Sequence, residues 1–179
     1  MVSMKNLIPL VLAAVLFPGL LCARTVQFNN SPIKTLDLSR YIGRWYEVAR
    51  FDHSFERGME NVTAEYTLRK DGKVEVINSG WKNGVFKYAE GKAKQPDPSS
   101  DPARLKVSFF LFFYSDYNIL MLDDDYQVAL VGSRSPEYLW ILSRTPKVDK
   151  AIIDILLEEA RSRGYDTSKF IWVNQTMNL

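Results

Sequence analysis

Apolar and polar residues alternate with a period of two along most of the chain between residues 43 and 143. In residues 62–68 this alternation places Val62, Ala64, Tyr66 and Leu68 on one face. The pattern is typical of a β-strand with one buried and one solvent-facing side. Short runs of strand character also occur at residues 45–50, 74–78, 87–94, 105–109, 117–122, 126–131 and 138–143. The sequence therefore predicts a series of short, regularly spaced strands.

The period changes near the C-terminus. Thr145 and Pro146 are typical of a helix start, with threonine as N-cap and proline at the first helical position. Gly164 is typical of a helix end. The helical stripe between them consists of Val148, Ile152, Ile155, Leu156 and Ala160. We also expect a brief helical turn over residues 37–42 and a short closing strand over residues 170–173.

Eight strands and one late helix predict an all-β fold: an eight-stranded up-and-down antiparallel β-barrel with one C-terminal α-helix packed outside. The interior of such a barrel holds one small ligand or is filled by side chains. No internal repeat is visible, which argues against a propeller or solenoid.

The first residues have the pattern of a signal peptide. Lys5 precedes an apolar run over residues 7–21, which is too short to span a bilayer comfortably. The alternative is an uncleaved membrane anchor or a buried helix. We divide the chain into a signal peptide (1–22), a tether (23–35) and the barrel domain (36–179).

Cys22, the single cysteine, ends that apolar run. Its position resembles the acylated cysteine of a bacterial lipoprotein, although Leu21 departs from the small residue usual before that cysteine. The alternative is ordinary cleavage near Ala23, which discards Cys22. A lipid anchor here would tether the barrel to a membrane face, in the outer membrane or facing the periplasm.

Composition excludes some functions. The net charge is +2 and basic and acidic residues are interspersed, so nothing favours nucleic-acid binding. His53 is the single histidine and has no partner at metal-ligand spacing, so we expect no metal site and place it in an exposed loop. The acidic run 123–125 is interpreted as a solvated hairpin turn. No cofactor is expected.

Gly43 and Trp45 open the first strand, and Arg144 follows the last one. An indole near the floor of a closed sheet needs a cover, which a stacked guanidinium supplies at about 2 kcal/mol or more. We therefore expect these residues to seal one end of the barrel and to leave the other end open.

Strand alternation predicts a set of inward-facing side chains that would contact a ligand. Burying a tyrosine hydroxyl or an asparagine amide in a dry core costs free energy unless the group finds a hydrogen-bond partner. In a ligand pocket, the same groups orient an apolar ligand. The alternative is an interior filled by its own side chains. The predicted pocket residues are Tyr66, Val76, Asn78, Phe109, Tyr117, Ile119, Trp140 and Leu142.

Residues 109–114 form a nearly unbroken apolar run. We interpret it as an apolar rim at the open mouth, or as a contact in a homodimer, since exposed apolar patches mark interaction sites. The alternative is a strand end buried under the helix or a loop.

Three motifs in order, Gly43–x–Trp45, Asp125–Tyr126 and Arg144, resemble the signature of the lipocalin family. Residues 45–50, 105–110, 138–146 and 169–173 are similar to the bacterial outer-membrane branch and its animal relative apolipoprotein D. The absence of a disulfide agrees with the bacterial branch. The resemblance implies a barrel that binds a hydrophobic molecule, with fatty acids or lysophospholipids as ligands for that branch, and dimerisation.

We expect an exported protein that binds, transports or stores such a ligand in the bacterial cell envelope and is not an enzyme. A second hypothesis is an enzyme that acts on a lipid in the same barrel, for which Glu47 or Glu90 would supply an inward carboxylate. A third is a surface interaction protein with a filled barrel.

Overall fold

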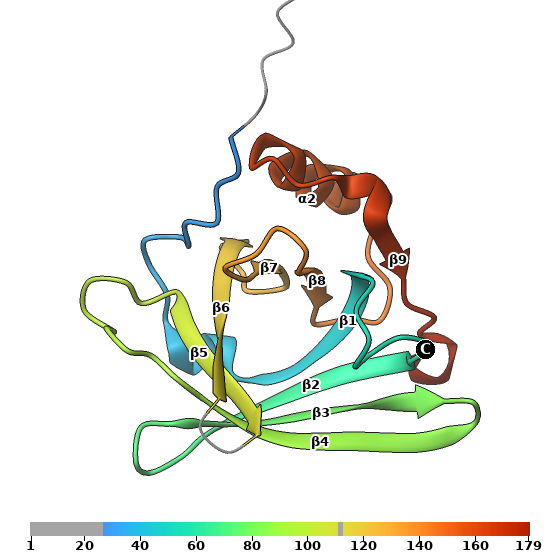
Figure 1. Cartoon of the computed structure of the whole chain (residues 1–179), viewed down its shortest axis with the longest axis horizontal. Helices are drawn as coiled ribbons and strands as arrows, with labels where there is room; N and C mark the ends of the chain where they lie inside the picture. The colour runs from blue at the N-terminus through green and yellow to red at the C-terminus, as the bar shows by residue number, and fades with distance from the viewer. Residues whose placement is uncertain (1–26, 111–112) are drawn as a thin grey trace, which may run out of the picture.

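Nine antiparallel strands form one sheet that closes on itself in the computed structural model, which describes residues 27–110 and 113–179. The strand order is β2-β3-β4-β5-β6-β7-β8-β1-β9, and β1 also pairs with β2. That last pairing closes strands β1 to β8 into a barrel (Figure 1). The prediction of an all-β barrel with a late helix is confirmed.

The strands are β1 (Gly43–Phe51), β2 (Glu60–Leu68), β3 (Val74–Lys82), β4 (Val85–Lys94), β5 (Arg104–Phe110), β6 (Phe113–Leu122), β7 (Val128–Gly132), β8 (Leu139–Ser143) and β9 (Phe170–Trp172). The helices are α1 (Leu38–Tyr41), α2 (Lys150–Ser162) and two short 3₁₀ turns, η1 (Thr167–Lys169) and η2 (Thr176–Asn178). Within residues 27–110 and 113–179, no helix is long and apolar enough to cross a membrane.

Helix α2 begins later than the sequence predicts. Asp149, not Thr145, is its N-cap residue. The hydroxyl of Thr145 instead donates to the carbonyl of Lys147, so this segment forms a turn between β8 and the helix. The buried face also differs from the predicted stripe: Ile152 and Ile155 are 37% and 56% exposed, and Ile153 and Leu157 take part in the packing against the barrel. Gly164 follows the helix with φ of +84°, as expected for a C-terminal stop.

Two tight turns explain the first hairpins. Gly72 lies between β2 and β3 with φ of +77°, directly after Asp71, and Asp-Gly is a common pair in hairpin turns. The β3–β4 turn consists of Asn83 and Gly84, both with positive φ (+53° and +74°). Asparagine followed by glycine is the usual pair for a two-residue turn of this kind, and this signal was missed in the sequence.

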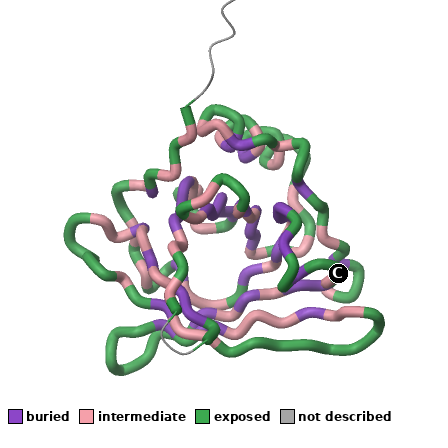
Figure 2. Tube along the Cα trace, in the orientation of Figure 1, coloured by how far each residue is buried: buried purple, intermediate pink, exposed green. Residues whose placement is uncertain are grey.

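The core has two layers, one inside the barrel and one between the barrel and α2 (Figure 2). The inner layer includes Trp45, Val76 and Ile119. The outer layer joins Leu156 and Ala160 of α2 to Leu130 of β7 and its neighbours. Helix α2 therefore covers one side of the barrel and does not extend over either of its ends.

Irregular pairings change which side chains face inward. The register of β1 against β8 shifts between Glu47 and Ala49. Because of this bulge, Glu47 pairs with Leu142 and faces the interior, Ala49 joins the outer core layer, and Arg50 faces inward opposite Trp140. Strict alternation from Trp45 would place Ala49 inside instead.

The segment that precedes α1 is irregular, as the tether assignment implies, but it packs on the barrel. Phe28 contacts Tyr165 edge to face at 5.1 Å between ring centroids. The side-chain amide of Asn30 donates to the carbonyl of Ser133, and the backbone N–H of Ile33 donates to the carbonyl of Ile119. The described part of the tether is therefore held along the barrel wall.

The end of the chain closes the seam between β1 and β2. The Gln175 amide donates to the carbonyl of Glu47 at 2.8 Å and to that of Val62 at 2.9 Å. Gln175 is 6% exposed, so both bonds are shielded from water. The carbonyl of Asn174 also accepts a bond from the N–H of Asn61 on β2. This segment joins the two strands where their direct pairing has ended.

Replacing the seam residue tests this role. Gln175→Ala leaves two buried carbonyls without a donor, so we expect the free energy of unfolding to fall by about 2 kcal/mol. Chemical denaturation followed by fluorescence measures it. Gln127→Ala is the matched control, since Gln127 is exposed and bonds only locally to Asp125. Equal stability of the two variants would contradict the role of Gln175 in closing the seam.

Candidate ligand-binding site

One end of the barrel is closed by Trp45 and Arg144. The guanidinium carbon of Arg144 lies 3.9 Å from the centroid of the Trp45 ring, and Trp45 is fully buried. The indole N–H donates to the carbonyl of Tyr41 in α1 at 2.8 Å. Gly43 has φ of +93°, and a Cβ there would lie 3.4 Å from Nη1 of Arg144. The structure thus brings together the three residues that the sequence places at the floor.

Arg144 also binds the backbone around the floor. Its guanidinium donates to five carbonyl oxygens at 2.7–3.3 Å: Nε to Tyr126, Nη1 to Arg44, and Nη2 to Arg40, Tyr41 and Ile42. Three of these carbonyls, those of Arg40, Tyr41 and Ile42, lie in or next to α1, whose C-terminal carbonyls have no partner within so short a helix. Arg144 therefore fastens α1 over the end of the barrel. Tyr126, predicted as the start of β7, lies in the preceding turn with φ of +59°.

Three phenols meet inside the barrel above the floor. The hydroxyl of Tyr117 is 2.6 Å from that of Tyr41 and 3.1 Å from that of Tyr66. Burial raises the pKa of all three side chains, that of Tyr66 to about 12. Three O–H donors share two mutual hydrogen bonds, so one phenolic proton remains for another acceptor. The group is a neutral, polar patch in an apolar chamber.

Burial of inward-facing residues decreases from the floor to the opposite end. On β4, Ala93 is buried, Gly91 is half-buried and Ala89 is exposed, and all three face inward opposite Val74, Val76 and Asn78. Exposure of the inward-facing side chains therefore rises from the Trp45 end of the barrel toward Ala89, which lies beyond the residues that pair β4 with β5. We call this solvent-accessible end the mouth.

The predicted pocket residues all lie on the inner side of the sheet. Four belong to the inner core layer, namely Tyr66, Val76, Ile119 and Leu142, while Tyr117 and Trp140 pack against it. Asn78 pairs with Ala64 and Ala89, and its Oδ1 is buried without a hydrogen-bond partner. Phe109 is 44% exposed and lies nearer the mouth, where its ring covers Gly91.

A buried charge cluster lies between the inner wall and the β1–β2 loop (52–59). Arg50 Nη1 donates to Glu47 Oε1 at 2.6 Å, and its Nη2 donates to the carbonyls of Glu56 and Met59 in that loop. The Trp140 indole donates to Glu56 Oε2 at 3.2 Å. Arg50 thus holds the loop against the mouth from inside.

Burial sets the charge of this cluster. It raises the pKa of Glu47 from 4.5 to about 8, aided by the neighbouring Glu56, and it also raises the pKa of Glu56. Burial and Arg50 lower the pKa of His53 to about 4, so this imidazole is neutral at pH 7. The cluster therefore takes up or releases a proton near neutral pH.

Two sequence expectations about these residues are corrected. His53 is 6% exposed rather than a surface residue, because its ring stacks on Phe55 at 3.9 Å and lies 5.2 Å from Trp140. Glu90 pairs with Ile77 on the outer face of the barrel and is exposed, so it supplies no inward carboxylate. The sequence offers no short-range signal for the cluster, since a bulge and a loop bring its members together.

No group of three or more potential metal ligands is found within residues 27–110 and 113–179. Cys22, the predicted lipidation site, lies outside the described residues, as do residues 111–112 of the predicted apolar rim. Phe110 and Phe113, on either side of that gap, are 68% and 74% exposed. The rim is thus exposed where it is described, and it is not buried under the helix.

Comparison with known proteins gives consistent matches. The profile of a family described as lipocalin-like domain matches residues 36–175. The chain is 46% identical over 169 residues to an outer membrane lipoprotein Blc of Vibrio cholerae, covering 93% of this chain and 96% of that protein. It is 34% identical over 151 residues to mouse apolipoprotein D, covering 79% and 78%.

The fold resembles that of solved structures as well. Insecticyanin from the tobacco hornworm Manduca sexta superposes with a TM-score of 0.70 at 25% identity. The match covers 83% of this chain and 85% of that one.

The floor can be tested with a charge-conserving substitution. Arg144→Lys keeps the cation but removes the planar fork that serves several carbonyls, so we expect the free energy of unfolding to fall by about 2 kcal/mol. Urea denaturation at neutral pH measures the loss. Arg44→Lys is the control, because Arg44 forms an exposed pair with Glu65 and exposed pairs contribute little. Similar losses in both variants would argue against the floor contacts.

The raised pKa of Glu47 predicts a pH dependence. The folded state holds this proton more tightly than the unfolded state, so the stabilisation is complete below about pH 4.5 and is lost as pH rises through about 8. Glu47→Gln cannot lose this proton. Between about pH 4.5 and 8, we therefore expect the free energy of unfolding of the variant to rise relative to that of the parent. Thermal unfolding from pH 4.5 to 9 measures it, and Glu90→Gln is the control that parallels the parent. A difference that does not change with pH would contradict the assignment.

Proposed function

The chain belongs to the lipocalin family, and we propose that its barrel binds a single-chain lipid, a fatty acid or a lysophospholipid, in the bacterial cell envelope. Lipocalins are generally binding proteins for small hydrophobic molecules, not enzymes.

The observation that carries the proposal is the gradient of burial along the inner wall. Val74 and Val76 are 1% exposed near the floor, and Ala89 is exposed at the mouth. A chamber of eight strands that is sealed at one end and open at the other accepts an elongated molecule end first. A single acyl chain has that shape.

The chemistry of the wall agrees with such a ligand. Most inward residues are aliphatic or aromatic, and burial of each methylene contributes about 0.8 kcal/mol. A few polar atoms interrupt this surface, namely the phenol group around Tyr117 and the unpartnered Oδ1 of Asn78. A largely apolar cavity with few placed polar groups is typical of a lipid site. Affinity would come from the tail and orientation from these groups.

The proposal includes export and attachment to the outer membrane through an acyl group on Cys22. The apolar run that precedes this cysteine has signal-peptide length. Relatives that match nearly the full chain, such as the protein of Vibrio cholerae, carry the name outer membrane lipoprotein. Lipid binding near a membrane would serve the uptake or storage of free lipids.

The contents of the barrel can be measured directly. We expect native mass spectrometry of the chain, purified from a Gram-negative host, to show a bound lipid in near-stoichiometric amount. Extraction should identify it as a fatty acid or a lysophospholipid. An empty barrel whose Trp140 fluorescence is also insensitive to added fatty acid would overturn the proposal in favour of a filled barrel.

Blocking the mouth provides an independent test. Ala89 faces inward and is exposed, so Ala89→Trp places an indole across the entrance and should weaken lipid binding at least about tenfold, a loss of about 1.4 kcal/mol. Titration with a fluorescent fatty acid measures it. Tyr88→Trp is the matched control, since the adjacent Tyr88 faces outward and stacks with Phe86. Unchanged affinity in both variants would place the ligand outside the barrel.

A further inference from the structure

The two ends of the barrel carry different exposed side chains. Four phenylalanines are 51–74% exposed at the mouth, in the β1–β2 loop, at the start of β4 and on both sides of the β5–β6 connection: Phe55, Phe86, Phe110 and Phe113. At the closed end, Leu68 is the large apolar side chain that is exposed among the described residues. Its neighbours there are charged, for example Arg69 and Asp71. Of the two barrel ends, the mouth thus carries more exposed apolar side chains, while others lie on α2, on β9 and near the C-terminus.

The mouth phenylalanines are held in place by the sheet. Phe110 and Phe113 pair across the ends of β5 and β6, and their rings stack at 6.3 Å between centroids. Phe55 stacks on the buried ring of His53, whose loop is fastened by Arg50. Their outer surfaces are exposed to solvent. Exposed apolar side chains of this kind mark contact with a protein or a membrane.

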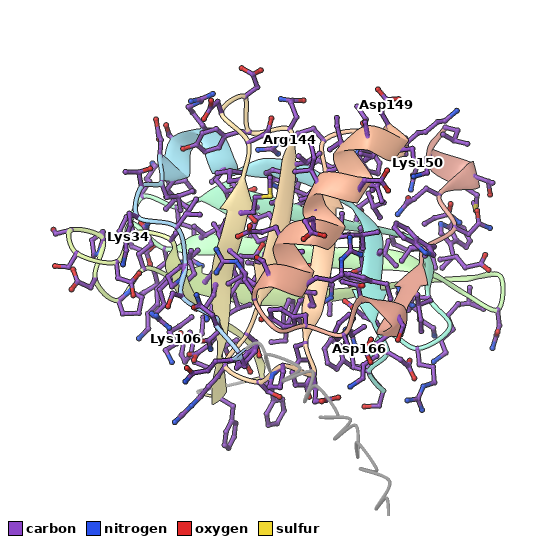
Figure 3. The ribbon with its side chains drawn as sticks, turned by 90° about the horizontal axis from the view of Figure 1, so that it is seen from above. Lys34, Lys106, Arg144, Asp149, Lys150 and Asp166 are labelled. Atoms are coloured by element: carbon purple, nitrogen blue, oxygen red, sulfur yellow. The ribbon has the colours of Figure 1, made fainter. Side chains whose placement is uncertain are left out.

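The N-terminal segment leaves the barrel near the same end. Asn30 is bonded to the carbonyls of Ser133 and Arg134 in the loop between β7 and β8, which is a mouth-side loop. Figure 3 shows the barrel from the side, with Arg144 at the closed end and Lys106, on β5, toward the mouth. Phe28 is the first described residue with a packing contact, and it lies six positions after Cys22. Six residues span at most about 21 Å.

We propose that the mouth of the barrel docks on the lipid surface that carries the anchor, with Phe55, Phe110 and Phe113 entering the headgroup region. The inference rests on the proposed attachment at Cys22, since an acyl group there keeps Phe28, and with it the mouth-side end of the N-terminal segment, within about 21 Å of the membrane. These three phenylalanines then decide which end faces the bilayer. A lipid would pass between membrane and barrel along a phenylalanine-lined path.

The orientation can be measured on the acylated full chain in vesicles of phosphatidylethanolamine and phosphatidylglycerol that contain brominated phosphatidylcholine. Phe113→Trp places a probe at the mouth, and Asp124→Trp places a matched probe in the exposed turn at the closed end. After subtraction of the parent signal, we expect bromine to quench the mouth probe at least about threefold more. Equal quenching of both probes, or stronger quenching at the closed end, would overturn the orientation.

A second measurement separates docking from binding. In Phe110→Ser/Phe113→Ser, the rate of fluorescent fatty acid transfer from vesicles should fall at least about fivefold, while affinity for the free fatty acid in solution stays unchanged. Leu68→Ser removes an exposed apolar side chain at the closed end and should match the parent in both assays. A transfer rate that the double substitution does not change would contradict docking through the rim.

The failure of the proposed function would be visible separately. If the parent chain binds no lipid, the proposed function is rejected. The two tryptophan probes still report the orientation in that case. The mass of the purified chain shows whether Cys22 is acylated. If cleavage removes Cys22, the probes are tested on the unanchored chain with the same vesicles. Stronger quenching of the mouth probe supports docking, and its absence rejects it.

Discussion

The contact between Arg144 and Trp45 is the constraint on which the other features depend. One guanidinium covers the indole and holds the carbonyls of α1, so a segment without strand character closes the barrel. This closure makes the two ends different. The inner wall is then buried near the floor and accessible at the mouth, which is the arrangement that a container for an elongated apolar molecule needs.

Much of this fold follows from local sequence. Period-two alternation identified the eight barrel strands, and the spacing of Trp45 and Arg144 identified the floor. The inward side of residues such as Val76 and Leu142 followed from the same alternation, because a strand without bulges keeps its faces over its whole length. Whether these residues contact a ligand is a separate question that alternation does not address.

The charge cluster at the mouth depends on features that alternation cannot anticipate. The bulge after Glu47 inserts one residue and turns Arg50 inward, and the β1–β2 loop then brings Glu56 to Trp140 across a long sequence separation. His53 was misplaced for the same reason, since burial of a loop residue depends on tertiary contacts. The late start of α2 shows that an N-cap signal also competes with local turn bonds, here those of Thr145.

The seam that Gln175 closes has a consequence for biogenesis. Strand β1 is among the first parts of the barrel to be synthesised, yet its partners β8 and β9 and the amide of Gln175 all come from the last part of the chain. Pairing over such sequence separation is slow, and it cannot begin before residues 139–175 have been synthesised. The barrel therefore stays unclosed along β1 while most of the chain is being made.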